Sequence, residues 1–177
     1  MKTKYLSSQH KFIILVILSL ATIATHWYLS ALHYNLKLGL SEGSSLCNVS
    51  TTFNCDSVAT SKYASLFGVP VAVLGLWTQL VYLILLLTAQ FKLSEFFENI
   101  KRLLFWLSSF IAIISVVMFS ISTLKLGTYC LVCMLAYLFS WLQLLFTASY
   151  QDNSALPQFG KDIGVFFTQC RWPIVVL

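Results

Sequence analysis

Leu103 to Leu124 reads LLFWLSSFIAIISVVMFSISTL and contains no Lys, Arg, Asp or Glu. An α-helix needs about 20 residues to cross the hydrocarbon core of a bilayer, where no water is present to hydrogen-bond an open backbone. The stretch therefore predicts a membrane-spanning helix. Three further stretches share this length and lack of charge: Phe12–Leu32, Gly68–Ala89 and Cys130–Ala148. We expect four transmembrane helices.

The overall composition agrees with a membrane protein. Hydrophobic residues make up 58% and charged residues 10% of the 177 residues, whereas soluble domains contain roughly 25% charged residues. This excludes an ordinary soluble globule. The net charge of +5 comes from scattered single residues, so no nucleic-acid partner is expected. The expected fold class is all-α and integral to the membrane: a four-transmembrane-helix bundle with an outward-facing loop that carries a short helix.

Lysine and arginine are divided unevenly between the two sides of the predicted bundle. Three fall on one side, at Lys37, Lys62 and Lys125, and the other eight fall on the side of both termini. The positive-inside rule then places both termini in the cytoplasm. The loop 33–67 and the turn 125–129 face the oxidising side, the periplasm of a bacterium or the lumen of the endoplasmic reticulum. We expect a bacterial inner membrane with the active site facing the periplasm.

The chain after residue 148 differs in character from the four apolar stretches. We predict a four-helix membrane domain over residues 1–148 and a cytoplasmic or interfacial tail over residues 149–177. Gly164–Leu177 is apolar but is interrupted by Arg171 and Pro173, and it is too short for a confident fifth span. We expect it to lie at the membrane interface. Cys170 then lies on the cytoplasmic side, where we interpret it as a buried or lipid-facing thiol.

Cys130 and Cys133 form a Cys-Leu-Val-Cys motif at the start of the fourth predicted helix. Residues at i and i+3 share one helix face, so the two sulfurs lie close enough for a disulfide that opens with little backbone movement. Thr128 is the expected N-cap. The free N–H groups and the positive end of the helix dipole would stabilise a thiolate. The motif predicts thiol–disulfide exchange.

Cys47 and Cys55 make a second pair in the outward loop, with seven residues between them. Gly39, Gly43 and two neighbouring serines make the approach to Cys47 flexible, so that one thiol of the pair can reach two different partners. The loop pair can therefore accept electrons from an outside protein and pass them to Cys130.

Other interpretations of the four outward cysteines stay open at this point. Two static disulfides would staple the bundle, as they do in many secreted proteins, although a CxxC within one helix constrains little beyond itself. Four cysteines can also hold a metal, but thiolates compete poorly for zinc on an oxidising side. The competing function is a non-catalytic membrane protein that binds a metal or a small hydrophobic molecule and is stapled by disulfides.

The order and spacing of the motifs resemble the vitamin K epoxide reductase family over about Phe12–Ala148. In that family a spaced cysteine pair comes first and the CxxC comes at the last helix, whereas other quinone-linked disulfide oxidases have the CxxC in the first outward loop. The residues that carry the resemblance are Cys47, Cys55, Ser61, Phe67-Gly68-Val69-Pro70, Tyr129-Cys130-Leu131-Val132-Cys133 and Tyr137.

The resemblance implies a membrane thiol–disulfide oxidoreductase that supports disulfide bond formation and reduces a quinone of the ubiquinone, menaquinone or vitamin K type. It implies that Cys133 lies beside the quinone and that Cys130 is its partner and receives electrons from Cys55. Cys47 would meet the protein donor. Many bacterial relatives carry a fused thioredoxin-like domain that this chain lacks, so the expected donor is a separate thioredoxin-like protein on the outer side.

The resemblance also implies that the hydroxyls of Ser61 and Tyr137 hydrogen-bond the carbonyl oxygens of the quinone. Donors held in an apolar site stabilise the negative charge that develops on these oxygens during reduction. Tyr137 lies four residues after Cys133 and therefore on the same helix face. Without the resemblance, Ser61 would be interpreted as a helix cap and Tyr137 as a packing aromatic.

Overall fold

The computed structural model describes residues 2–40, 45, 47–50, 52–91 and 97–150. Among them, four helices are long and apolar enough to span a membrane, at Gln9–Lys37, Val71–Gln90, Asn99–Leu126 and Leu131–Tyr150. These confirm the four predicted spans. The elements are α1 (Lys2–Lys37), α2 (Cys55–Thr60), β1 (Ser65–Leu66), β2 (Val69–Pro70), α3 (Val71–Gln90), α4 (Phe97–Ile121), η1 (Ser122–Leu126) and α5 (Leu131–Tyr150). The predicted tail from residue 151 onward, with Cys170, lies outside the described residues.

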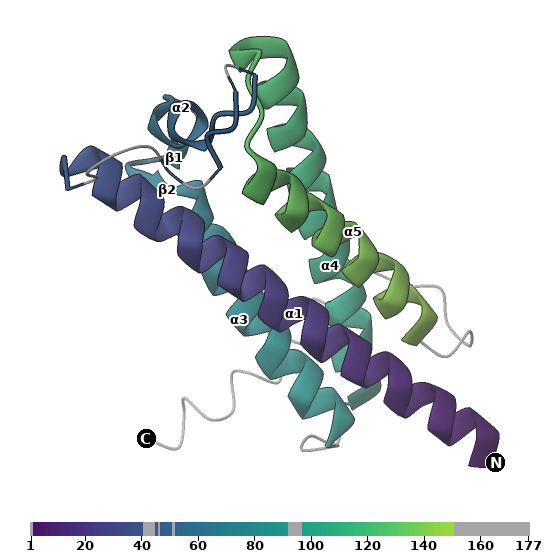
Figure 1. Cartoon of the computed structure of the whole chain (residues 1–177). Helices are drawn as coiled ribbons and strands as arrows, with labels where there is room; N and C mark the ends of the chain where they lie inside the picture. The colour runs from purple at the N-terminus through teal and green to yellow at the C-terminus, as the bar shows by residue number, and fades with distance from the viewer. Residues whose placement is uncertain (1, 41–44, 46, 51, 92–96, 151–177) are drawn as a thin grey trace, which may run out of the picture.

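The four long helices form one bundle in which consecutive helices run in opposite directions (Figure 1). Helices α1 and α4 each pack against both α3 and α5. Leu15, Tyr82, Leu86 and Leu104 are fully buried where the helices meet. The all-α bundle predicted from the sequence is therefore confirmed.

Polar side chains cross the interior of the bundle between α3 and α5. The carboxamides of Gln79 and Gln143 exchange two hydrogen bonds of 3.2 and 3.3 Å, and Tyr82 Oη lies 2.7 Å from Thr147 Oγ1. All four side chains are buried. Lipid offers no replacement for these partners, so the bonds fix α3 against α5, although such bonds contribute only about 0.6 kcal/mol each on average.

Gly75 of α3 allows a close approach of α1, because the His26 ring lies where a Cβ would be. A Cβ on Gly75 would lie 2.0 Å from His26 Cδ2, and His26 Nδ1 donates to Thr22 O at 2.9 Å. Gly75→Ala must turn the ring and strain this bond. We therefore expect the free energy of unfolding, measured in mixed micelles, to fall by about 1–3 kcal/mol. His26→Ala should largely restore it, and an unchanged Gly75→Ala protein would contradict the contact.

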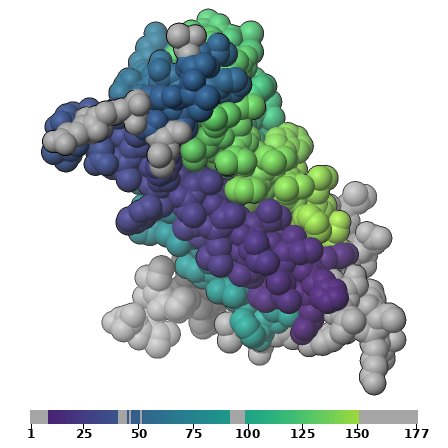
Figure 2. Space-filling view, viewed as in Figure 1, coloured from purple at the N-terminus to yellow at the C-terminus, as the bar shows by residue number. Residues whose placement is uncertain are grey.

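The loop between α1 and α3 covers the end of the bundle at which α5 begins. Phe53 pairs with Tyr129 in a short parallel bridge, in which Tyr129 makes backbone hydrogen bonds of 2.8 and 2.9 Å to the loop. His33 Nδ1 of α1 donates to Ala59 O of α2 at 2.7 Å. Figure 2 shows the loop, in blue, as a cap that lies against the first turns of α5. The short helix expected in this loop is α2.

Candidate functional site

The turn that leads into α5 is fixed by its own hydrogen bonds. Helix α4 ends in the five-residue π-helical turn η1, which stops at Gly127 in the left-handed region with a φ of 64°. A glycine adopts this conformation without a steric penalty. Gly127 N–H donates to Ser122 O at 3.0 Å, and the Ser122 hydroxyl donates to Thr128 O at 2.5 Å. These contacts place Cys130 directly before the first residue of α5.

Cys130 lies at the entrance of α5 with its sulfur turned toward the free N–H groups of the first turn. Cys133 N–H donates to Cys130 Sγ at 3.2 Å. The Cys133 thiol and the N–H groups of Cys133 and Val132 donate to Cys130 Sγ, which lowers the pKa of the Cys130 thiol although burial opposes the shift. Both cysteines are free thiols. Cys130 is therefore the cysteine of the pair whose thiolate form is stabilised.

The sequence-based prediction that Thr128 caps this helix is wrong. Helix α5 begins at Leu131, three residues after Thr128, and the Thr128 hydroxyl is buried without a hydrogen-bond partner among the described residues. The Cys130 sulfur accepts the N–H that a cap would accept. Sequence alone could not show this, because sulfur is a weak acceptor and is rarely considered as a cap.

Cys47 and Cys55 form a disulfide with their Cα atoms 5.7 Å apart. Asn54 caps α2 through a 2.8 Å hydrogen bond from Ser57 N–H, so Cys55 is the first residue of that helix. Cys55 is fully buried, and Cys47 and Cys130 belong to the same buried cluster. The structure thus brings the outer disulfide and the CxxC into contact with one hydrophobic core.

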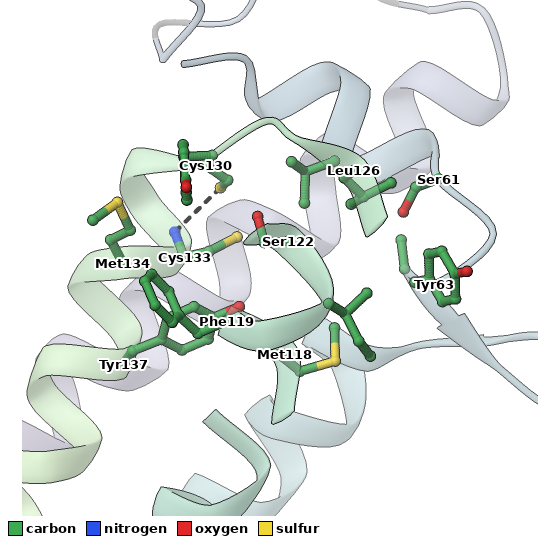
Figure 3. Close-up of a pocket in the computed structure, with 14 residues that line it drawn as sticks. Ser61, Tyr63, Met118, Phe119, Ser122, Leu126, Cys130, Cys133, Met134 and Tyr137 are labelled. Carbon is green, nitrogen blue, oxygen red and sulfur yellow. Dashed lines mark hydrogen bonds between the residues drawn. The ribbon is translucent and has the colours of Figure 1, made fainter. Parts of the chain in front are cut away.

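A partly open cavity lies beside the CxxC, between α2, α4 and α5 (Figure 3), and its empty space of about 380 Å³ includes the open solvent at its mouth. The Cys133 sulfur and the Ser61 hydroxyl point into it from opposite sides. The Ser61 hydroxyl is buried and has no hydrogen-bond partner in the part of the chain that the structure describes. The cavity can therefore offer a sulfur and an unused hydroxyl to a molecule within it. Its lining residues are Val58, Ser61, Tyr63, Ala64, Met118, Phe119, Ile121, Ser122, Leu126, Tyr129, Cys130, Cys133, Met134 and Tyr137.

Aromatic rings form one wall of the cavity. The ring of Phe119 lies edge-on to that of Tyr137, with centroids 6.4 Å apart. It also lies 6.3 Å from the ring of Tyr129, which in turn contacts Phe53 of the loop at 6.0 Å. The Phe119 ring lies at 84° to the Tyr137 ring and at 34° to the Tyr129 ring, so the wall can present both aromatic faces and aromatic edges to a bound ring. It also connects the cavity to the bridge that holds the loop.

The residues singled out in the sequence fall into two groups in space. Ser61, Cys130, Cys133 and Tyr137 line the cavity, whereas the Cys47–Cys55 disulfide lies next to it. Ser61 ends α2, where its backbone N–H donates to Val58 O, so its hydroxyl is not used by the cap. Their catalytic and binding roles stay predictions.

Sequence reasoning missed several cavity residues, among them Phe119, Ser122 and Met134. Each is an ordinary apolar or small residue of a transmembrane helix. No motif distinguishes them, because they become neighbours of the CxxC only through the packing of α4 against α5.

Comparison with known families gives one match. The model of the vitamin K epoxide reductase family matches residues 13–148. No curated protein matches the chain. The matched range contains both cysteine pairs and every residue that lines the cavity.

Proposed function

This chain belongs to the vitamin K epoxide reductase family, and on that premise we propose that it carries electrons from an outward-facing thioredoxin-like protein to a quinone. It is an integral membrane protein of an oxidoreductase family. The observation that carries the proposal is the single buried cluster shared by Cys55 and Cys130, beside a cavity into which Cys133 opens. This arrangement supports a relay through two cysteine pairs.

The first half of the reaction is exchange at the outer disulfide. A thiolate of the donor attacks Cys47 Sγ, the Cys47–Cys55 bond breaks, and Cys55 leaves as a thiolate. The second thiol of the donor displaces Cys47, so the donor leaves oxidised and both loop cysteines are reduced. Two electrons have then entered the loop pair.

The second half passes these electrons inward. The Cys55 thiolate attacks Cys130 in a Cys130–Cys133 disulfide, Cys133 leaves as a thiolate, and Cys47 then attacks Cys55 to restore the outer disulfide. The outer pair is now oxidised and the CxxC reduced, which is the state that the structure describes. The two thiols next give two electrons and two protons to the quinone. Quinol and a Cys130–Cys133 disulfide are the products.

Ser61 and Tyr137 act as donors to the quinone oxygens in this proposal. The support for Ser61 is its buried and unpartnered hydroxyl at the cavity. The support for Tyr137 is its place on the cavity wall one helical turn below Cys133. Hydroxyls in a dry site stabilise a developing negative charge without reorganisation. The proposed acceptor is a quinone of the ubiquinone, menaquinone or vitamin K type.

The location and extent of the domain belong to the same proposal. We assign residues 1–148 to one membrane domain and residues 149–177 to a cytoplasmic or interfacial tail, in a bacterial inner membrane with both cysteine pairs facing the periplasm. The four spans found among the described residues put residues 2 and 150 on one side, and the excess of Lys and Arg on that side favours the cytoplasm. Both cysteine pairs lie at the opposite end of the bundle.

The proposal is tested by mass spectrometry of non-reduced peptides. Purified protein with reduced Cys130 and Cys133 is mixed with ubiquinone-1 or menadione under anaerobic conditions. An enzyme closes the Cys130–Cys133 disulfide and forms one quinol per protein. The competing function, a non-catalytic binder of a metal or a small hydrophobic molecule, leaves both thiols free and forms no quinol.

Tyr137→Phe removes one hydroxyl at the cavity and keeps the ring that packs against Phe119. We expect turnover to fall on the order of tenfold or more, because losing a preorganised donor to a developing charge costs up to roughly 10²–10³ in rate. Thermal stability should stay nearly unchanged. Steady-state quinol formation, measured beside a melting curve, gives both quantities.

Tyr63→Phe is the matched control for this prediction. Tyr63 also lines the cavity, but its hydroxyl points away from it (Figure 3), so its loss should leave turnover close to that of the wild type. Full activity in Tyr137→Phe would make Tyr137 a packing residue only.

A further inference from the structure

The two cysteines of the outer disulfide are held in different ways. Cys55 begins a helix that is fastened on two sides. On one side the loop residues before it bridge to Tyr129, and on the other His33 Nδ1 donates to Ala59 O at 2.7 Å. These contacts do not involve Cys47, so Cys55 keeps its place beside Cys130 whether or not the disulfide is closed.

The residues around Cys47 are held by the side chain of Asp56 and by the backbone of Phe53, whose carbonyl oxygen accepts hydrogen bonds from Val49 N–H at 3.1 Å and Ser50 N–H at 3.3 Å. Asp56 Oδ2 accepts hydrogen bonds from Ser45 N–H at 3.3 Å and from Asn48 Nδ2 at 2.5 Å. Asp56 N–H donates to Asn48 Oδ1 at 3.4 Å. Ser45 and Asn48 stand on either side of Cys47 in the chain, so the contacts of Asp56 bracket the reactive cysteine.

This arrangement covers the disulfide. Cys47 is 5% exposed and Cys55 is 0% exposed. A thiolate must approach the attacked sulfur in line with the bond that breaks, and access to that sulfur limits the rate of exchange. A protein donor therefore reaches Cys47 only after the residues around it have moved outward.

Only one of the two oxygens of the Asp56 carboxylate accepts a hydrogen bond among the described residues. Its other oxygen, Oδ1, is buried and has no hydrogen-bond partner among the described residues. A buried carboxylate oxygen without a partner is unfavourable, and water reaches it when the neighbouring residues move away. The regained hydration offsets part of the loss of the two accepted hydrogen bonds, so this contact can open without unfolding α2.

We infer that Asp56 is a clasp that holds Cys47 against the bundle and sets how often the outer disulfide is exposed to the donor. Asp56 is thus a positioning residue that acts through Cys47. The inference about its effect on the donor reaction rests on the proposed role of Cys47 as the point of electron entry. The clasp itself is a property of the disulfide and can be measured without donor or quinone.

The test measures how fast a water-soluble phosphine reduces the Cys47–Cys55 disulfide. The full chain is used in micelles, with Cys130, Cys133 and Cys170 replaced by serine so that one disulfide remains. The phosphine attacks one sulfur, the S–S bond breaks, and hydrolysis yields two thiols and the phosphine oxide. Alkylation and mass spectrometry then report the fraction of opened disulfide over time.

Asp56→Ala removes both accepted bonds, and we expect reduction to be roughly tenfold faster because a charge-assisted bond is lost. Asn48→Ala should act in the same direction, and adding it to Asp56→Ala should give little further increase, because the two residues form one contact. Asp56→Asn keeps an acceptor oxygen at the Oδ2 position and should stay within about threefold of the parent rate. Ser57→Ala, an exposed position on the same helix, is the matched control and should leave the rate unchanged.

Two outcomes would overturn the inference. One is an unchanged rate in Asp56→Ala. The other is a faster rate in Asp56→Ala together with a comparable increase in the rate of hydrogen exchange at the Tyr129 and Asn54 amides. Such an increase would mean that the whole of α2 had detached from the bundle. Neither readout involves a quinone, so a protein that shows the clasp but forms no quinol would count against the proposed function alone.

Discussion

Replacement of Cys133 by alanine is expected to abolish quinone reduction, whereas Cys170→Ala is expected to leave it near the wild-type rate. Quinol formation requires two thiols that close into one disulfide, and Cys133 is the thiol that opens into the cavity one turn inside α5. Cys130 alone cannot supply both electrons. Cys170 lies outside the described residues, and the charge count predicts it on the cytoplasmic side, so we expect its thiol to take no part.

The measurement is steady-state formation of quinol from ubiquinone-1 with a reduced dithiol donor. Cys133→Ser serves as a second variant, because it keeps a polar atom of similar size and should be equally inactive. Melting curves of both variants show whether the bundle is intact. Near-normal turnover without Cys133 would disprove its assignment as the thiol beside the quinone.

The four spans were predictable from sequence because lipid imposes a single strong rule on the backbone. A chain without water must form continuous hydrogen bonds, so an uncharged stretch of about 20 residues has few alternatives to a helix. The ends of the helices were less predictable. Helix α1 continues to Lys37, past the predicted end at Leu32, because the loop packs against its last turns. Hydropathy does not indicate where a helix ends once its residues lie in water outside the membrane.

The site was predictable only in part. Helix geometry predicts Cys130, Cys133 and Tyr137 on a common face. In the structure Cys130 directly precedes α5, and Cys133 and Tyr137 lie in its first two turns. The cavity itself depends on contacts far apart in sequence. The Phe53–Tyr129 bridge and the π-helical turn η1 set its shape, and neither carries a local signal.

In the proposed relay, burial gives the two cysteine pairs different tasks. A quinone is soluble in lipid and a protein donor is soluble in water, so no single cysteine pair can meet both without moving across the interface. Cys55 is fixed next to Cys130 in one buried cluster, whereas Cys47 is attached beside it through the disulfide and Asp56. In this proposal, a short movement of the loop at Cys47 is enough to pass electrons from a donor in water to the cysteines beside the membrane-buried cavity.

Cys47→Ala tests this division between the two pairs. We expect oxidation of a reduced thioredoxin-like protein to fall to background, because Cys55 is fully buried and a protein donor cannot reach it. With dithiothreitol as the donor, turnover should remain within roughly threefold of wild type, since a small dithiol can attack the Cys130–Cys133 disulfide directly through the open cavity. Both rates are read as quinol formed from the same quinone.

The double variant Cys47→Ala/Cys55→Ala is the control for this experiment. In the single variant the free Cys55 thiol can form a disulfide with Cys130 and block the CxxC, and the double variant removes that possibility. It should keep turnover with dithiothreitol and lose turnover with the protein donor. Equal loss with both donors in the double variant would mean that the loop pair supports the quinone site structurally, and the relay through Cys47 and Cys55 would then be wrong.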